Sequence, residues 1–111
     1  MNKLIIIAIV FYSSFSYADC PTDQFDMACI YGDLSEAVRV HIANKDFNSA
    51  ERVAEDMLNI DPADSWARVY LLVALKSQSK PIPDWLSSGP WPNSNEEERI
   101  LESIGNAIIN D

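Results

Sequence analysis

The side chains of this 111-residue chain that could do chemistry are few and scattered. His41 is the single histidine, and as a general base it would need a nucleophile and an orienting partner, which no linear motif supplies. On a helix face with Val38 and Ile42 it is expected to be packed or half-exposed. Glycoside cleavage needs two carboxylates that flank a cleft, and sequence spacing establishes no such pair. With only three glycines there is no phosphate-binding loop, so we expect neither catalysis nor a cofactor.

The two cysteines, Cys20 and Cys29, suggest a structural role. Two cysteines without nearby histidines supply too few ligands for zinc, so no metal site is expected. Their spacing also differs from the C-x-x-C spacing of redox sites. An even pair in an exported protein predicts a disulfide. Closing a loop of about ten residues would stabilise the fold by roughly 2–3 kcal/mol.

Residues 1–18 have the pattern of a cleavable signal peptide. Lys3 supplies the positive charge, residues 4–12 form an unbroken apolar run, and Ser16 and Ala18 are the small residues that a signal peptidase reads. The alternative is an uncleaved anchor, but the run is shorter than the roughly 20 residues that span a bilayer, which argues against it. We expect cleavage after Ala18, a periplasmic or secreted protein of a bacterial envelope, and no stable membrane insertion of the mature chain.

The mature chain, residues 19–111, is strongly acidic. The whole sequence has 8 basic and 17 acidic residues, so loss of Lys3 leaves 7 basic residues and a net charge of −10. This charge argues against nucleic acid, whose phosphates require Lys and Arg, and against anionic membrane surfaces. It favours basic or apolar partners, although acidity can also serve solubility alone. The length suits one compact domain.

Helical spacing of apolar residues recurs through the first half of the mature chain, and no segment alternates as a strand does. We expect a short helix over residues 22–32 that ends at Gly32. A second helix, over residues 33–43, would begin with a capping box of Asp33 and Glu36. The next helix begins at Phe47 and has an acidic outer face. Proline stops it at residues 61–62.

The following helix, expected from about Asp64, should form the centre of the domain. Its middle, residues 69–75, is apolar on every side. Because a helix without a polar face has to be surrounded, the other helices are expected to pack around this one.

Beyond Lys80 the composition changes sharply. Four prolines exclude a long helix over residues 81–93, and we expect a structured loop there with one turn around residues 84–86. Ser94 and Glu97 predict a capping box. The carboxylates of residues 96–98 suit the positive end of a helix dipole. The last helix, within residues 94–110, is expected to cover one flank of the central helix.

Residues 45–62 resemble the second helix of a tetratricopeptide repeat. Phe47 follows the inter-helix turn, Ala50 is the small residue three positions later, and Pro62 closes the unit. The next unit is similar to a first helix at Ala67, Leu71, Ala74 and Leu75. The sequence departs from the family pattern at Val38, His41, Met57 and Arg68.

The resemblance covers residues 31–80, about one and a half degenerate units. It implies an all-α fold of antiparallel helix pairs, with four to five short helices and a C-terminal capping helix. Repeats of this kind usually need at least three stacked units, so the N-terminal disulfide and the segment after residue 80 would act as caps. The alternative is an unrelated helical bundle.

In this family the first helix of each unit lines a concave surface that binds peptide segments of other proteins. The resemblance therefore implies a partner-binding surface here. Its residues would be Ser35, Arg39, Ile42, Ala43, Trp66, Val69, Val73 and Lys76.

Two tryptophans of the proline-rich segment, Trp85 and Trp91, are further candidates for partner binding, because tryptophan is enriched in interface hot spots. The alternative is that both rings fold back onto the central helix, and Trp66 also suits a core position. We expect a protein–protein interaction module, either an adaptor, an assembly factor or a subunit of an envelope complex, that binds a protein or peptide. The alternative is an acidic inhibitor or immunity-type protein that blocks a basic enzyme or toxin.

Overall fold

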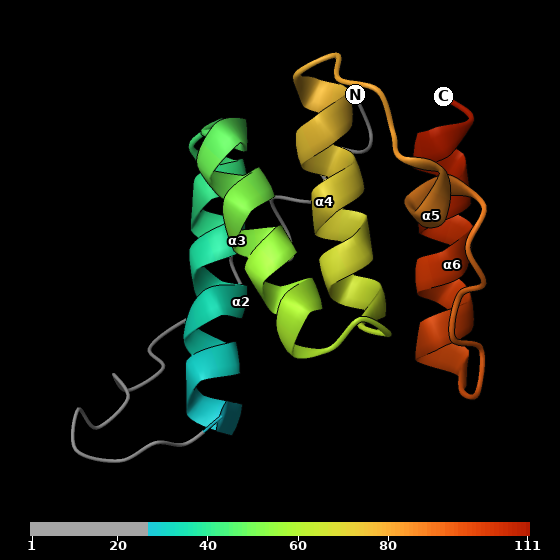
Figure 1. The fold of residues 1–111 in the computed structure, drawn as a ribbon, viewed down its shortest axis with the longest axis horizontal. Coiled ribbons are helices and arrows are strands. Elements are labelled where there is room, and N and C mark those ends of the chain that lie inside the picture. Colours follow the sequence, from blue (N-terminus) through green and yellow to red (C-terminus); the bar gives the residue numbers. More distant parts are fainter. Residues whose placement is uncertain (1–26) are drawn as a thin grey trace.

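The computed structural model describes residues 27–111, which form five helices and no strand (Figure 1). The helices are α2 (Met27–Ala43), α3 (Phe47–Ile60), α4 (Ser65–Ser77), α5 (Asp84–Ser87) and α6 (Glu96–Ile109). The predicted all-helical class is therefore confirmed for this part of the chain. The predicted signal peptide, residues 1–18, and Cys20 lie outside the described residues.

The first described helix differs from the prediction, because α2 continues without a break where two helices were expected. Gly32 lies inside α2 and does not end a helix, contrary to the prediction from the sequence. Glycine weakens a helix interior by about 1 kcal/mol relative to alanine, and packing outweighs this effect. Val38 is fully buried, and Leu34 packs against the same core.

Cys29 lies in the first turn of α2 and is half-buried. No cysteine among residues 27–111 is free, and Cys20, the expected partner, is outside this range. The disulfide therefore stays a prediction. Within the same range, no helix is both long enough and apolar enough to cross a bilayer.

Helix α3 begins and ends, and α4 begins, where the sequence predicts. The Asp46 side chain caps α3 by accepting from the Ser49 amide. Helix α3 ends at Ile60, just before Pro62. The side chain of Asp64 caps α4 by accepting from the amides of Trp66 and Ala67.

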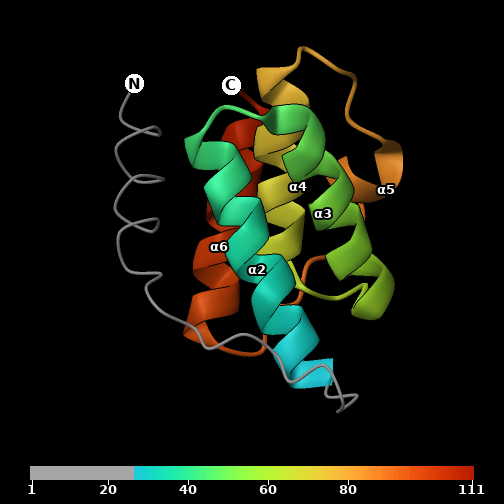
Figure 2. The ribbon, with the colours of Figure 1, turned by 90° about the vertical axis from the view of Figure 1, so that its left-hand side faces the viewer.

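Helix α4 is the centre of the structure, as its apolar sequence predicts. It contacts α2, α3 and α6, and Figure 1 shows it between α3 and α6. Of residues 69–75, six are buried and Val73 is half-buried. A view from the side shows α2 and α6 on one side of the molecule, with α3 and α5 on the other (Figure 2).

Helix α6 runs in the same direction as α4, along one flank of it. At their N-terminal ends, Trp66 Nε1 donates to Glu97 Oε1 at 2.8 Å. At their C-terminal ends, Lys76 Nζ donates to the Asp111 carbonyl at 3.1 Å. The chain therefore has to return from one end of α4 to the other through the proline-rich segment before α6 begins.

Leu86 and Arg68 are two of the residues that attach this returning segment to the core. Leu86 of α5 is fully buried. Arg68 of α4, which departs from the repeat pattern, donates to the carbonyls of Pro62 and Pro90 and lies 5.5 Å from the centre of the Trp91 ring. The predicted turn around residues 84–86 is confirmed as α5.

The start of α6 lies one residue later than predicted. Asn95, not Ser94, is the N-cap, and its side chain accepts from the Glu98 amide at 2.8 Å. The amide and hydroxyl of Ser94 donate to Glu98 Oε1 at 2.8 and 2.6 Å. The capping box therefore exists in a shifted form, with Glu98 in the role expected for Glu97.

Candidate functional site

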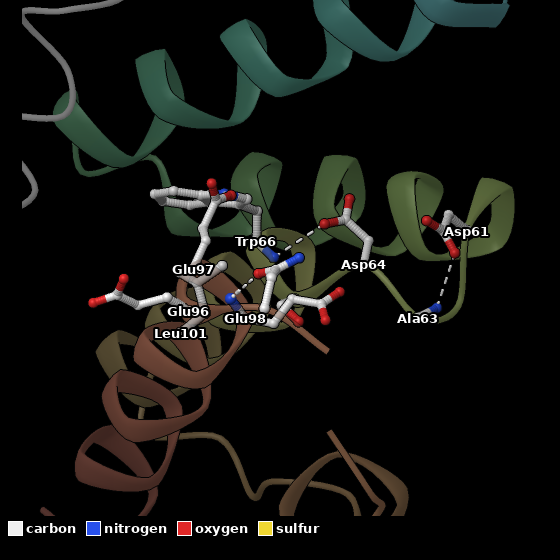
Figure 3. A pocket seen from close by; sticks show the side chains of 10 residues that line it. Asp61, Ala63, Asp64, Trp66, Glu96, Glu97, Glu98 and Leu101 are labelled. Atoms are coloured by element: carbon white, nitrogen blue, oxygen red, sulfur yellow. Dashed lines mark hydrogen bonds between the residues drawn. The ribbon is translucent and has the colours of Figure 1, made fainter. Parts of the chain in front are cut away.

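A hollow of the described structure lies where the N-terminal ends of α4 and α6 meet the loop after α3 (Figure 3). We call it the α4–α6 pocket; it is open to solvent and has a volume of about 530 Å³. Its lining consists of Asp61, Ala63, Asp64, Ser65, Trp66, Asn95, Glu96, Glu97, Glu98 and Leu101. Five of these residues are acidic and none is Lys, Arg or His.

Some of the pocket carboxylates already accept hydrogen bonds from the chain. Asp61 Oδ1 accepts from the Ala63 amide at 3.1 Å, and Glu97 holds the Trp66 indole. Glu98 accepts from Ser94, and these hydrogen bonds lower the pKa of its carboxyl. In Figure 3 the Trp66 ring lies at one side of the pocket and Asp61 at the other, with Asp64 between them.

Asp64 is a pocket carboxylate with one oxygen that lacks a hydrogen-bond partner. Its Oδ1 accepts from the amides of Trp66 and Ala67 at 3.0 and 3.3 Å, whereas its Oδ2 is buried without a hydrogen-bond partner. Burial raises the pKa of Asp64 despite the two backbone hydrogen bonds, which act to lower it. The adjacent Ser65 is only 5% exposed, and its Oγ also has no partner. Both atoms are covered by the chain and do not face the open part of the pocket.

The raised pKa of Asp64 predicts a specific dependence of stability on pH. A carboxyl that binds its proton more tightly when folded stabilises the fold fully below the unfolded pKa, about 3.9. That contribution is lost as pH rises through the folded pKa. Asp64→Asn keeps the cap acceptor and removes the charge, so its free energy of unfolding should rise relative to wild type as pH rises above about 4. Urea unfolding at several pH values measures this difference.

Asp46 is the matched control, because it caps α3 in the same way but is exposed. Hydrogen bonds from Ser49 lower the pKa of Asp46, and a lowered pKa stabilises the fold above the unfolded value. Asp46→Asn should therefore lose stability relative to wild type as pH rises through the acidic range. If both variants followed pH in the same direction, the distinct environment of Asp64 would be refuted.

The surface predicted from the repeat resemblance is only partly available in the structure. Ile42 and Val69 are buried in the core. Ser35, Arg39 and Val73 are half-buried, and Ala43 is exposed at the end of α2. Ser35 and Arg39 lie beside the Tyr70 side chain, whose pKa is raised chiefly by burial.

The two remaining residues of the predicted surface, Trp66 and Lys76, bind the C-terminal part of the chain. Trp66 is half-buried and bound to Glu97, and Lys76 is half-buried and bound to the carbonyl of Asp111. The predicted partner-binding residues of α4 therefore make contacts within the chain. Sequence alone does not show this, because both contacts join residues more than 30 positions apart.

The two tryptophans of the proline-rich segment have different environments. Trp91 is 9% exposed, so the core alternative holds for this ring, whereas Trp85 is 52% exposed. Trp85 borders a second hollow of about 350 Å³, which we call the Trp85 groove. The groove is lined by Glu55, Asp56, Leu58, Asn59 and Trp85.

His41 is half-buried, and its Nδ1 lies 3.7 Å from Asp46 Oδ2. The two form an ion pair when the imidazole is protonated. Among residues 27–111 there is no group of three or more His, Cys, Asp or Glu side chains placed to hold a metal ion.

The pocket carboxylates were not predicted as a site. The sequence explains Glu96, Glu97 and Glu98 by helix electrostatics alone. The sequence does show acidic residues at two helix starts, at Asp64 and at residues 96–98. No local sequence pattern shows that these two helix starts lie close together.

Comparisons of the chain with protein-family models, with curated proteins and with solved structures gave no match. The part of the chain that the structure describes is all-helical, and the α4–α6 pocket and the Trp85 groove are both acidic hollows bordered by a tryptophan.

Proposed function

We propose that this protein is an exported protein–protein interaction module, an adaptor, assembly factor or complex subunit, that uses Trp85 as its main anchor for a partner protein. The observation that carries the proposal is the exposure of Trp85 beside acidic residues of α3. Buried tryptophan side chains dominate many protein interfaces. A half-exposed tryptophan in an otherwise folded segment is therefore a natural anchor.

The helix that carries Trp85 is anchored on the core by its neighbour Leu86, which favours binding. Helix α5 is held by Leu86, which is fully buried next to Trp85 in sequence. The Ser88 amide donates to the Asp84 carbonyl at 2.8 Å, and Pro81 and Pro83 restrict the chain before the helix. A ring held in place before binding loses less conformational entropy when the partner binds.

The chemistry of the groove indicates the kind of partner. Trp85 and Leu58 are apolar, and Glu55 and Asp56 are exposed carboxylates on α3. A segment with both apolar and basic side chains complements this surface. The predicted export places such a partner in the bacterial envelope or outside the cell.

A tetratricopeptide-like build is part of the proposal. The chain reverses direction at residues 44–46 and again at residues 61–64, so α2 and α4 run parallel with α3 between them in sequence (Figure 1). The proline-rich segment takes the place of a further helix before α6. This alternation of helices and short turns supports a tetratricopeptide-like arrangement, with α6 as the capping helix.

Trp85→Ala tests the proposal. The variant should weaken capture of the partner by about 30-fold or more, the change that corresponds to a hot spot of about 2 kcal/mol. Its thermal unfolding should stay close to wild type, because the ring is half-exposed. The measurement is capture from the native envelope by the mature protein, with mass spectrometry to identify the partner and titration to measure its affinity.

Ile100→Ala is the matched control, because Ile100 is exposed to the same 52% but lies on α6, away from the groove. It should leave capture unchanged. Equal capture by wild type and Trp85→Ala would contradict the proposal, as would equal loss in both variants.

The concentration of carboxylates in both hollows favours the second candidate, an acidic inhibitor or immunity-type protein. Charge steering would then dominate association, and its rate should fall steeply as salt rises. The association of an adaptor anchored by Trp85 should depend much less on salt, because the apolar ring supplies most of the binding energy. Inhibition of the captured partner's own activity would separate the two functions directly.

A further inference from the structure

We propose that the outer face of α6 pairs two copies of this chain, with the two α6 helices antiparallel about a twofold axis. The surface consists of Ile100, Ser103, Ile104 and Ala107, which are all exposed and which we call the outer stripe of α6. Trp85 lies on α5, outside the stripe. The pairing is therefore independent of the proposed function.

Helix α6 has apolar residues on two faces. Its inner face, with Leu101, Gly105 and Ile108, is buried. On the outer face, Ile100 and Ile104 are 52% and 37% exposed. Among residues 27–111, α6 is the one helix that exposes two large hydrophobic side chains. Positions 100, 104 and 107 have the spacing of four and three residues that places side chains on one side of a helix, so they form a continuous stripe.

The stripe is complementary in shape to a reversed copy of itself. In a twofold pair, residue i contacts residue j and residue j contacts residue i. The axis of an antiparallel pair would lie between Ser103 and Ile104, so that these two residues face each other across it. Ile100 of each copy would then face Ala107 of the other, and a large side chain meets a small one at each step. A parallel pair would instead oppose Ile100 to Ile100 and leave a gap between the two Ala107 residues.

The charges at the two ends of the stripe favour the same arrangement. At the N-terminal end of α6 lies the α4–α6 pocket, which is lined by five acidic residues and no basic one. At the C-terminal end lies Lys76, whose Nζ is 3.1 Å from the Asp111 carbonyl. An ammonium has three donors, so Lys76 can also donate to a carboxylate of a second copy. An antiparallel pair places the acidic end of each copy beside Lys76 of the other, whereas a parallel pair opposes two acidic ends.

Shape and charge together identify a second copy as the occupant of the stripe, because both the order of large and small residues and the order of charged ends reverse along α6. The size of the surface sets the strength of the pairing. Helix α6 has 14 residues and is therefore about 21 Å long. One such helix pair buries less than the roughly 800 Å² per partner of a standard interface, so the pairing should be weak and reversible.

Sedimentation equilibrium of the folded mature protein tests the proposal. The chain is strongly acidic, so the measurement uses about 0.15 M salt, at which exposed charges more than about 8 Å apart are largely screened. Wild type should form dimers in a concentration-dependent way below about 1 mM. Ile100→Ser/Ile104→Ser should raise the dissociation constant by about tenfold or more, because two aliphatic side chains are no longer buried between the copies.

The matched control is Val40→Ser/Ile60→Ser, which removes two aliphatic side chains that are 37% and 38% exposed on α2 and α3. It should pair as wild type does. A wild type that stays monomeric up to about 1 mM would overturn the proposal, and so would equal weakening by the two double variants. Circular dichroism of each variant verifies that its helices are intact.

A second measurement tests the antiparallel direction with one exposed substitution in each copy. Ile100→Cys and Ala107→Cys each place a single thiol on the stripe. In a glutathione redox buffer, a mixture of the two variants should form disulfide-linked dimers faster than either variant alone, because the two thiols face each other only across an antiparallel pair. Cross-linking of Ile100→Cys with itself at an equal or higher rate would overturn the proposed pairing.

Discussion

Replacing Trp91 by alanine is expected to lower the free energy of unfolding by about 3–5 kcal/mol, the range for buried aromatic side chains. Trp91 is buried, lies under the Arg68 guanidinium and packs against Gly105 of α6. Its Nε1 has no hydrogen-bond partner, so the loss is one of packing. Urea unfolding followed by circular dichroism measures the effect.

Gly105 provides a control in which the sign of the effect reverses. A Cβ added at Gly105 would meet Cζ2 of Trp91 at 2.6 Å, so Gly105→Ala should destabilise the wild type. Alanine is nevertheless the better helix former by about 1 kcal/mol. In the Trp91→Ala background, Gly105→Ala should therefore stabilise the protein. Simple additivity of the two substitutions would refute the packing of Trp91 against α6.

The ends of the helices could be predicted where the signal is local. Phe47 after a polar turn, Pro62, and Asp64 before an apolar run each act within a few residues of themselves, and α3 begins and ends, and α4 begins, where these residues predict. The central place of α4 was also predictable. A segment with no polar face has no solvent-compatible orientation, whatever its neighbours are.

The departures arise where a tertiary contact competes with a local preference. Gly32 carries a local stop signal, but Val38 and its neighbours keep α2 continuous through packing on the core. At the start of α6, Ser94 and Asn95 are both good caps. With Asn95 as the N-cap, Ser94 is free to donate to the Glu98 side chain. Neither residue type alone predicts this arrangement.

The candidate sites depend on topology and were only partly predictable. Trp85 and Trp91 have similar sequence surroundings, and they differ because Gly105 leaves room for one ring on α6. The α4–α6 pocket requires α4 and α6 to run parallel, which follows from the length of the returning segment and from the contact of Trp66 with Glu97. No local pattern encodes that direction.

The position of α4 at the centre of the structure leads to the second large prediction. Successive residues on a helix are about 100° apart, so Tyr70 and Leu72 point to nearly opposite sides. Tyr70 is 6% exposed and Leu72 is fully buried. Tyr70→Ala and Leu72→Ala should therefore each lower the free energy of unfolding by about 2–5 kcal/mol, which is a large part of the roughly 5–15 kcal/mol of a typical domain.

Ile104→Ala is the control for this pair, because Ile104 is also a large aliphatic residue on a helix but is 37% exposed. Its effect should stay well below that of Leu72→Ala in the same urea experiment. A helix covered on one side alone would tolerate either Tyr70→Ala or Leu72→Ala. Loss at both positions is thus the specific signature of a helix enclosed by α2, α3 and α6, and tolerance at either position would show that one side of α4 faces solvent.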